Sequence, residues 1–205
     1  MRTIDILDIM EHTFPNAKCE LHYNDAFQLA VAVCLSAQTT DVRVNIITKD
    51  LFIKYPKVID FANASLSILE NDIRSIGLYK NKAKNIISMA NDVCNKFNGH
   101  LPDNMIDLLT LAGVGRKSAN VILSEYYKVP AIAVDTHVER VSKRLKIVSL
   151  EKSVLEIEKI LERKIPKNRW INSHHLLIFW GRYRCKAINP LCDDCELSKY
   201  CRYKG

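Results

Sequence analysis

Four cysteines near the carboxyl end of the chain are close enough in sequence to share a metal. They form a C-x6-C-x2-C-x5-C pattern that spans 17 residues: Cys185, Cys192, Cys195 and Cys201. The segment around them is rich in charged and turn-forming residues, so burial of four thiols in a core does not explain the cluster. Four thiolates can bind zinc or an iron–sulfur cluster, and the spacing alone does not separate the two.

A lysine and an aspartate form a second pattern with possible chemistry. Lys117 follows the glycines Gly113 and Gly115, and Asp135 lies 18 positions after the lysine. A lysine amine can attack an electrophilic carbon, and a carboxylate can stabilise positive charge or move a proton. The ordinary alternatives are a solvated lysine and a helix-capping aspartate.

These residues need helices to position them. The glycines form a tight turn after an apolar run, and the residues that follow repeat at the spacing of one helical face: Ala119, Ile122, Leu123 and Tyr126. The turn therefore joins two helices. The start of the second helix offers unpaired N–H groups, and glycine lets a phosphate oxygen approach the backbone because it has no Cβ.

The rest of the chain also predicts helices. A run that is apolar on nearly all sides follows Asp25 and indicates a buried central helix over residues 26–35. No strand-like alternation or internal repeat occurs, so the fold class is all-α. Further helices are expected over residues 4–14, 58–62, 66–75, 150–163 and 170–180. Another begins at a cap at Asp41 and runs towards residue 55, and one ends at residue 97. Two more run from residue 103 or 104 into the glycine turn and from after Asp135 to residue 145.

Composition favours a nucleic-acid partner. The net charge is +7, and residues 163–205 alone carry ten lysines and arginines against three acidic residues. A basic tail on a neutral body indicates a polyanion. Acidic residues interrupt the amino-terminal segment where a signal peptide would be apolar, and the longest apolar run, 29–35, is too short to span a membrane. We expect a cytoplasmic monomer (nucleoid-associated if bacterial), with no membrane partner, in which the cysteines stay reduced.

The motifs together resemble one known family. LAGVGRKSA, followed by VDTHV, looks like the helix-hairpin-helix and the catalytic aspartate of the endonuclease III family of DNA glycosylases, although Ala112 and Ser118 replace the proline and threonine of many relatives. The cysteine spacing after Gly181-Arg182-Tyr183 resembles the cluster loop of that family, which implies a [4Fe–4S] cofactor in place of zinc.

The resemblance also implies an architecture of two helical domains that flank a DNA cleft. A six-helix domain with the helix-hairpin-helix would cover residues 19–129. A discontinuous domain, residues 1–18 and 130–205, would carry the cluster loop.

Roles for single residues follow from the same resemblance. Lys117 would attack C1′ of a flipped nucleotide, and Asp135 would stabilise the sugar or assist proton transfer. LSAQTTD implies that Gln38 enters the gap left by the flipped base, and IGLYKNKA implies that Leu78 wedges the other side. The DNA backbone would contact Gly113, Gly115, Arg182 and Arg184.

The resemblance thus predicts a bifunctional DNA glycosylase and abasic-site lyase of base excision repair. Its substrate would be double-stranded DNA with oxidised pyrimidines or abasic sites, processed through a lysine Schiff base and β-elimination. One rival is a monofunctional mismatch glycosylase, such as the adenine glycosylases, but those lack a lysine at the position of Lys117. The other is a non-catalytic DNA-binding module with a structural zinc site.

Overall fold

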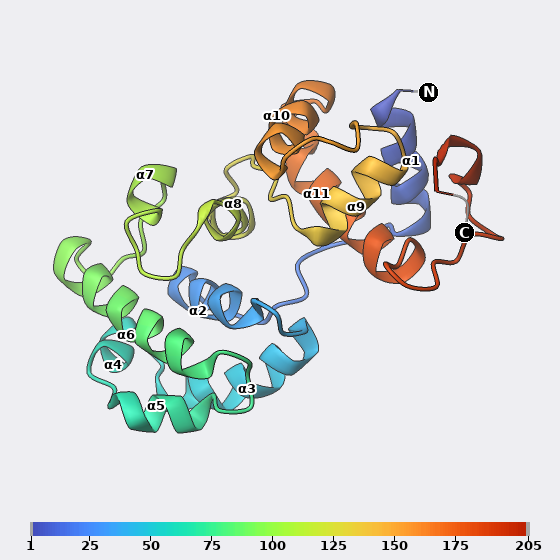
Figure 1. Cartoon of the computed structure of the whole chain (residues 1–205). Helices are drawn as coiled ribbons and strands as arrows, with labels where there is room; N and C mark the ends of the chain where they lie inside the picture. The colour runs from blue at the N-terminus through green and yellow to red at the C-terminus, as the bar shows by residue number, and fades with distance from the viewer. Residues whose placement is uncertain (1, 204–205) are drawn as a thin grey trace. The chain divides into compact units, whose positions relative to one another are not determined.

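The computed structural model describes residues 2–203, and all of the regular structure in this range is helical (Figure 1). No strand occurs among these residues, which confirms the all-α prediction. No helix in this part of the chain is both long and apolar enough to cross a membrane. The chain divides into two compact units, which we call the continuous unit, Glu20–Tyr127, and the split unit, Met1–Cys19 with Lys128–Gly205. The domain boundaries inferred from the sequence stay a prediction.

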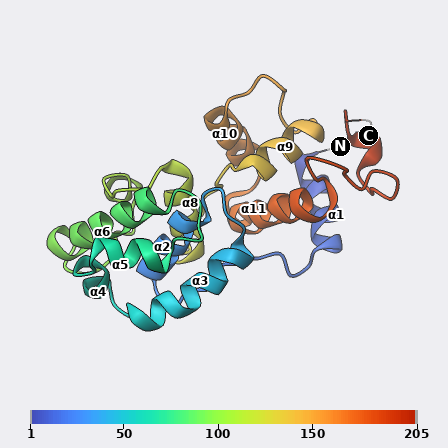
Figure 2. The same cartoon turned by 60° about the horizontal axis from the view of Figure 1, so that its bottom comes forward.

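The continuous unit contains seven α-helices in its described residues, one more than the resemblance implied, because a single helical turn before the glycines counts separately. The helices are α2 (Ala26–Ser36), α3 (Asp41–Lys54), α4 (Val58–Ala62), α5 (Leu66–Asp72), α6 (Tyr79–Lys96), α7 (Met105–Leu108) and α8 (Arg116–Glu125). Helices α4 and α5 pack against α6, as Figure 2 also shows. Helix α7 packs against α8.

Helix α2 is the centre of this unit. Nine of its eleven residues are buried, and α3, α6 and α8 all pack against it. The Asp25 carboxylate caps its start by accepting the N–H of Gln28 at 2.7 Å, as the sequence predicts. Burial of each large aliphatic or aromatic side chain contributes about 1.5–3 kcal/mol, so this one helix organises much of the stability of the unit.

The split unit joins the first helix of the chain to its carboxyl-terminal third. Its elements are α1 (Thr3–Thr13), α9 (Thr136–Arg144), α10 (Val154–Lys164), a 3-10 turn (Lys167–Arg169), α11 (Trp170–Phe179), a π-helical turn (Trp180–Arg184) and a 3-10 turn (Ser198–Tyr200). Trp180 is fully buried in its core. The Arg169 guanidinium bonds Asp8 at 2.7 Å and Glu11 at 2.9 Å, which ties α1 to the start of α11.

Three helix boundaries differ from the sequence predictions. Thr40, and not Asp41, caps α3, because its hydroxyl accepts the N–H of Arg43 while Asp41 becomes the first helical residue. Helix α5 ends at Asp72 and not at 75. Helix α10 starts at Val154 and not at 150, because Ser153 and Glu156 form a capping box there.

Gly181 lies in the π-helical turn where this turn meets α9. A Cβ at this position would stand 2.7 Å from the Cβ and 3.2 Å from the Cα of His137. Contacts that short do not occur, so the backbone approach requires a residue without a side chain.

We therefore predict that Gly181→Ala lowers the free energy of unfolding by about 1–3 kcal/mol, because the added methyl forces α9 and the turn apart. Urea denaturation measures the change. Gly77→Ala is the matched control, since a Cβ there meets nothing within 4 Å. Equal stabilities of the two variants would contradict the proposed close packing.

Candidate functional site

The glycine turn between α7 and α8 has the backbone that the sequence indicates. Gly113 has a φ of 79°, in the left-handed region that other residues rarely adopt. A Cβ on Gly113 would lie 3.1 Å from the side chain of Asn85, so the turn packs closely against α6. Both observations explain why this position holds glycine.

The start of α8 is open. Gly115 is its N-cap, no side chain caps it, and a Cβ on Gly115 would meet nothing within 4 Å. Lys117 is exposed in the first turn and makes no hydrogen bond or ion pair within residues 2–203. An uncapped helix start with an unengaged amine beside it is suited to bind an anionic ligand and present the amine to it.

Asp135 caps α9 in the split unit. Its Oδ1 accepts the N–H of His137 at 2.9 Å and that of Val138 at 2.8 Å. Asp135 has the extended backbone of an N-cap, whereas Thr136, which could also cap, is already the first helical residue. Oδ2 makes no hydrogen bond within the described residues, so a half-buried carboxylate oxygen stays available.

Gln38 and Leu78 share an unusual backbone. Their φ angles are 59° and 60°, and both side chains are exposed, Leu78 to 58%. A residue other than glycine in this conformation costs on the order of 1–3 kcal/mol and persists only where its surroundings enforce it. Because Leu78 is exposed in spite of this cost, its conformation indicates a functional role and not a role in core packing.

A buried lysine that sequence reasoning missed connects the turns of Gln38 and Leu78. Lys82 is 4% exposed, and its Nζ donates to the carbonyls of Leu35 at 2.9 Å and Ala37 at 2.6 Å. Burial lowers the pKa of this ammonium. A signal was present: Lys82 falls in the helical register of the buried residues of α6, which include Ile86, Met89 and Val93.

The four cysteines of the split unit lie in its last loop, which packs partly against the core. Arg144 donates to Cys185 Sγ at 3.3 Å, and the N–H of Tyr203 to Cys201 Sγ at 3.4 Å. Burial raises the pKa of the Cys201 thiol, and the Cys185 and Cys192 thiols raise it further. His, Cys, Asp and Glu side chains in the described range form no group of three that could hold a metal ion.

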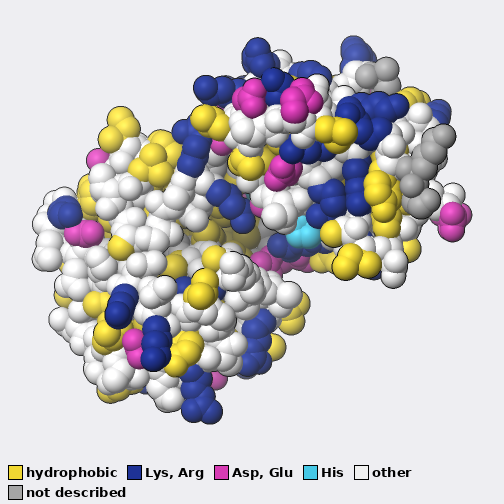
Figure 3. Space-filling model, in the orientation of Figure 1, with side chains coloured by type: hydrophobic (Ala, Val, Ile, Leu, Met, Phe, Trp, Pro, Cys, Tyr) yellow, Lys and Arg dark blue, Asp and Glu magenta, His cyan; other side chains and the backbone are white. Residues whose placement is uncertain are grey.

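The two arginines beside the cluster loop differ in their surroundings. Arg184 Nη2 donates to Glu196 Oε2 and to the carbonyl oxygen of Asp194, both at 2.6 Å, so this guanidinium braces the loop. Arg182 is half-buried, whereas Lys186 and Lys199 are exposed. Lys and Arg side chains gather on the face of the split unit shown in Figure 3, and those on the same face of the continuous unit are more scattered.

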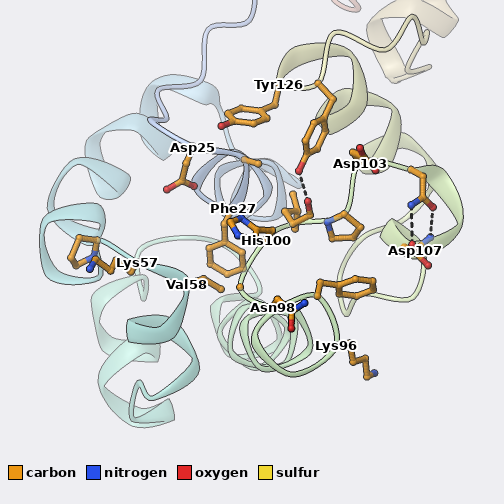
Figure 4. Close-up of a pocket in the computed structure, with 18 residues that line it drawn as sticks. Asp25, Phe27, Lys57, Val58, Lys96, Asn98, His100, Asp103, Asp107 and Tyr126 are labelled. Carbon is orange, nitrogen blue, oxygen red and sulfur yellow. Dashed lines mark hydrogen bonds between the residues drawn. The ribbon is translucent and has the colours of Figure 1, made fainter.

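A hollow of about 880 Å³ in the continuous unit contains none of the predicted site residues (Figure 4). Asp25, Asp103 and Asp107 line it, and one of its two lysines, Lys96, is paired with Asp92 at 2.7 Å. Tyr127 donates its hydroxyl to the Leu101 carbonyl there, and burial raises its pKa to about 12. Because carboxylates predominate, this hollow does not suit DNA phosphates.

Comparison with known proteins first defines a class. Residues 31–167 match the family model of the HhH-GPD superfamily of base excision DNA repair proteins. The chain is 53% identical to the endonuclease III of Bacillus subtilis (strain 168), over 96% of this chain and 90% of the relative. It is 38% identical to the endonuclease III of Escherichia coli (strain K12), over 99% and 96%. The chain belongs to the endonuclease III family.

Comparison with solved structures leads to the same family. An endonuclease III in a non-covalent complex with DNA matches with a TM-score of 0.95 and 52% identity, over 97% of this chain and 93% of that one. An endonuclease III in a trapped covalent intermediate with DNA matches with a TM-score of 0.95 and 51% identity, over 98% and 96%. The chain is thus a bifunctional DNA glycosylase and abasic-site lyase of base excision repair.

The capping role of Asp135 can be separated from its charge. Asp135→Ala should lower the free energy of unfolding by about 0.5–2 kcal/mol because α9 loses its cap, whereas Asp135→Asn keeps an acceptor oxygen and should lose much less. Urea denaturation of both variants measures this. Ser153→Ala, which removes the cap of α10, is the comparison for a purely structural cap. Equal losses in the alanine and asparagine variants would rule out capping by the Asp135 oxygen.

Proposed function

We propose that this enzyme removes oxidised pyrimidines and that Lys117 is its nucleophile. The observation that carries the proposal is the unengaged amine of Lys117 in the first turn of a helix whose start no side chain caps. The covalent endonuclease III–DNA intermediate of a relative 51% identical to this chain supports it, because a covalent link requires a nucleophile on the protein.

The chemistry begins with a nucleotide extruded from the duplex. The uncharged Lys117 amine attacks C1′; the new C–N bond replaces the bond between C1′ and the base, and the base leaves with the electron pair and takes up a proton. Loss of the amine protons and opening of the sugar ring give an imine between Lys117 and C1′. Loss of a proton from C2′ then breaks the bond from C3′ to its phosphate oxygen, and water releases the lysine.

Asp135 has the properties that the departing base requires. Its Oδ1 accepts two backbone N–H groups at the start of α9, and its Oδ2 has no partner among the described residues. We assign to this carboxylate the stabilisation of positive charge on the sugar and the transfer of protons to and from Lys117.

The remaining DNA contacts divide into two kinds. The backbone at Gly113 and Gly115 would hold a phosphate, which positions the duplex without reading its sequence. Gln38 and Leu78 would fill the stack where the extruded nucleotide has left, and their strained, exposed conformations support this. Arg182 remains a candidate for a phosphate contact; for Arg184 the bonds to Glu196 and Asp194 favour a role within the loop.

The cysteine loop would hold a [4Fe–4S] cluster through Cys185, Cys192, Cys195 and Cys201. Four cysteines within one loop can supply the four thiolates that such a cluster takes. When bound, the cluster would cross-link the loop to the core of the split unit. The DNA substrate and the bacterial sources of the similar relatives favour a cytoplasmic location.

Lys117→Ala tests the nucleophile. Borohydride should trap a covalent adduct between the enzyme and abasic DNA, and the variant should form none because no amine is left to give the imine. Denaturing electrophoresis measures the adduct. Lys49→Ala, which removes an exposed lysine of α3 in the same unit, is the control for the loss of one positive charge. An undiminished adduct in Lys117→Ala would refute the assignment and favour the monofunctional or the non-catalytic rival.

The cluster assignment predicts the metal content. Anaerobically purified protein should be coloured and contain iron and sulfide, and replacement of Cys192 by Ala should lower both, because a thiolate ligand is lost. Elemental analysis measures this, with Cys94→Ala as the control. A colourless protein with stoichiometric zinc would show that the four thiols form a zinc site.

A further inference from the structure

Lys82 is bonded to both turns that carry the proposed gap-filling side chains. Its backbone N–H donates to the Leu78 carbonyl at 3.1 Å, and its Nζ donates to the carbonyls of Leu35 and Ala37, the latter directly before Gln38. The turns lie 40 residues apart in sequence, and this one residue links them through three hydrogen bonds.

The Gln38 turn has few other bonds to fix it. Helix α2 ends at Ser36, and among the described residues the turn itself contains one backbone hydrogen bond, from the Thr39 N–H to the Ser36 carbonyl at 3.0 Å. The Thr39 hydroxyl is buried without a hydrogen-bond partner among the described residues. The carbonyls at the end of α2 are therefore satisfied by the Lys82 ammonium, which also complements the negative end of the helix dipole.

Burial of this ammonium costs free energy, which a purely structural hydrogen bond does not explain. Lys82 is 4% exposed, and within residues 2–203 no carboxylate pairs with it; the neighbouring titratable group is the Cys34 thiol. A buried charge without a counter-ion costs free energy unless its hydrogen bonds are well made. An apolar side chain in this register would continue the buried face of α6, but it would leave the carbonyls of Leu35 and Ala37 unpaired.

We propose that Lys82 is a positioning residue that holds Gln38 and Leu78 in register, so that both enter the same gap in the duplex. This inference rests on the gap-filling roles proposed above for these two side chains. Lys82 touches neither the substrate nor the reacting atoms in this scheme. It acts by fixing two left-handed turns that would otherwise relax independently.

The test uses the whole enzyme and two substrates. Lys82→Met keeps the apolar stem and removes the ammonium; it should slow single-turnover cleavage of duplex DNA containing an oxidised pyrimidine roughly 10- to 100-fold, the loss expected for charged hydrogen bonds. Its lyase action on single-stranded abasic DNA, which has no stack to fill, should stay at the wild-type rate. Lys96→Met, an exposed lysine on the same helix, should leave both rates unchanged.

Three outcomes would overturn the proposal. One is a Lys82→Met enzyme that cleaves the duplex at the wild-type rate while Gln38→Ala and Leu78→Ala do not. Another is an equal loss on both substrates, which indicates general damage. The third is full additivity of Lys82→Met with the Gln38→Ala/Leu78→Ala pair, because a residue that acts through those side chains has nothing left to position.

Further variants separate this inference from the proposed function. Lys117→Ala should lose action on both substrates, whereas loss on duplex alone marks the gap-filling apparatus. If Lys82→Met does not fold, Lys82→Arg keeps a cation on a wider head group, and it should lose activity on duplex alone. A fluorescent base analogue opposite the lesion should report less unstacking with either Lys82 variant; an unchanged signal would refute the positioning role.

Discussion

The burial of α2 on nearly all sides is the constraint on which the continuous unit depends. A helix with only one buried face can rotate or slide and still cover its core, but α2 has no free face to turn outward. The elements packed on it, α3, α6 and α8, are therefore fixed relative to one another. Two of these helices begin at turns that carry proposed site residues, Leu78 before α6 and the glycines before α8, and α2 itself ends at Ser36, two residues before Gln38.

The unpaired N–H groups at the starts of α8 and α9 are used in two different ways. The start of α8 has no side-chain cap, so its first N–H groups face outward and can meet an anion that the protein does not supply. The start of α9 is capped by Asp135, so its N–H groups hold a carboxylate that the protein does supply. Under the roles proposed above, phosphate binding at one start and chemistry at the other follow from whether the capping acceptor is external or internal.

Much of this could be predicted from the sequence, because it depends on local patterns. The apolar run after Asp25 indicated a buried helix, and the glycines with their helical register indicated the hairpin. Local competition between neighbouring polar residues was harder to resolve: Thr40 and Asp41, or Asp135 and Thr136, can each cap, and the backbone angles decide. Lys82 was missed for another reason, since its partners lie 45 and 47 residues away and no local pattern points to them.

The split unit has a consequence for biosynthesis. Ile6, Leu7 and Met10 of α1 are buried with residues such as Leu176 and Trp180. Helix α1 leaves the ribosome before the segment it packs against, and at typical elongation rates on the order of ten seconds separate the two. During that time the continuous unit can complete its own core, since all of its chain has been made. Helix α1 thus waits for its packing partner, and its apolar face is what a nascent-chain chaperone would meet.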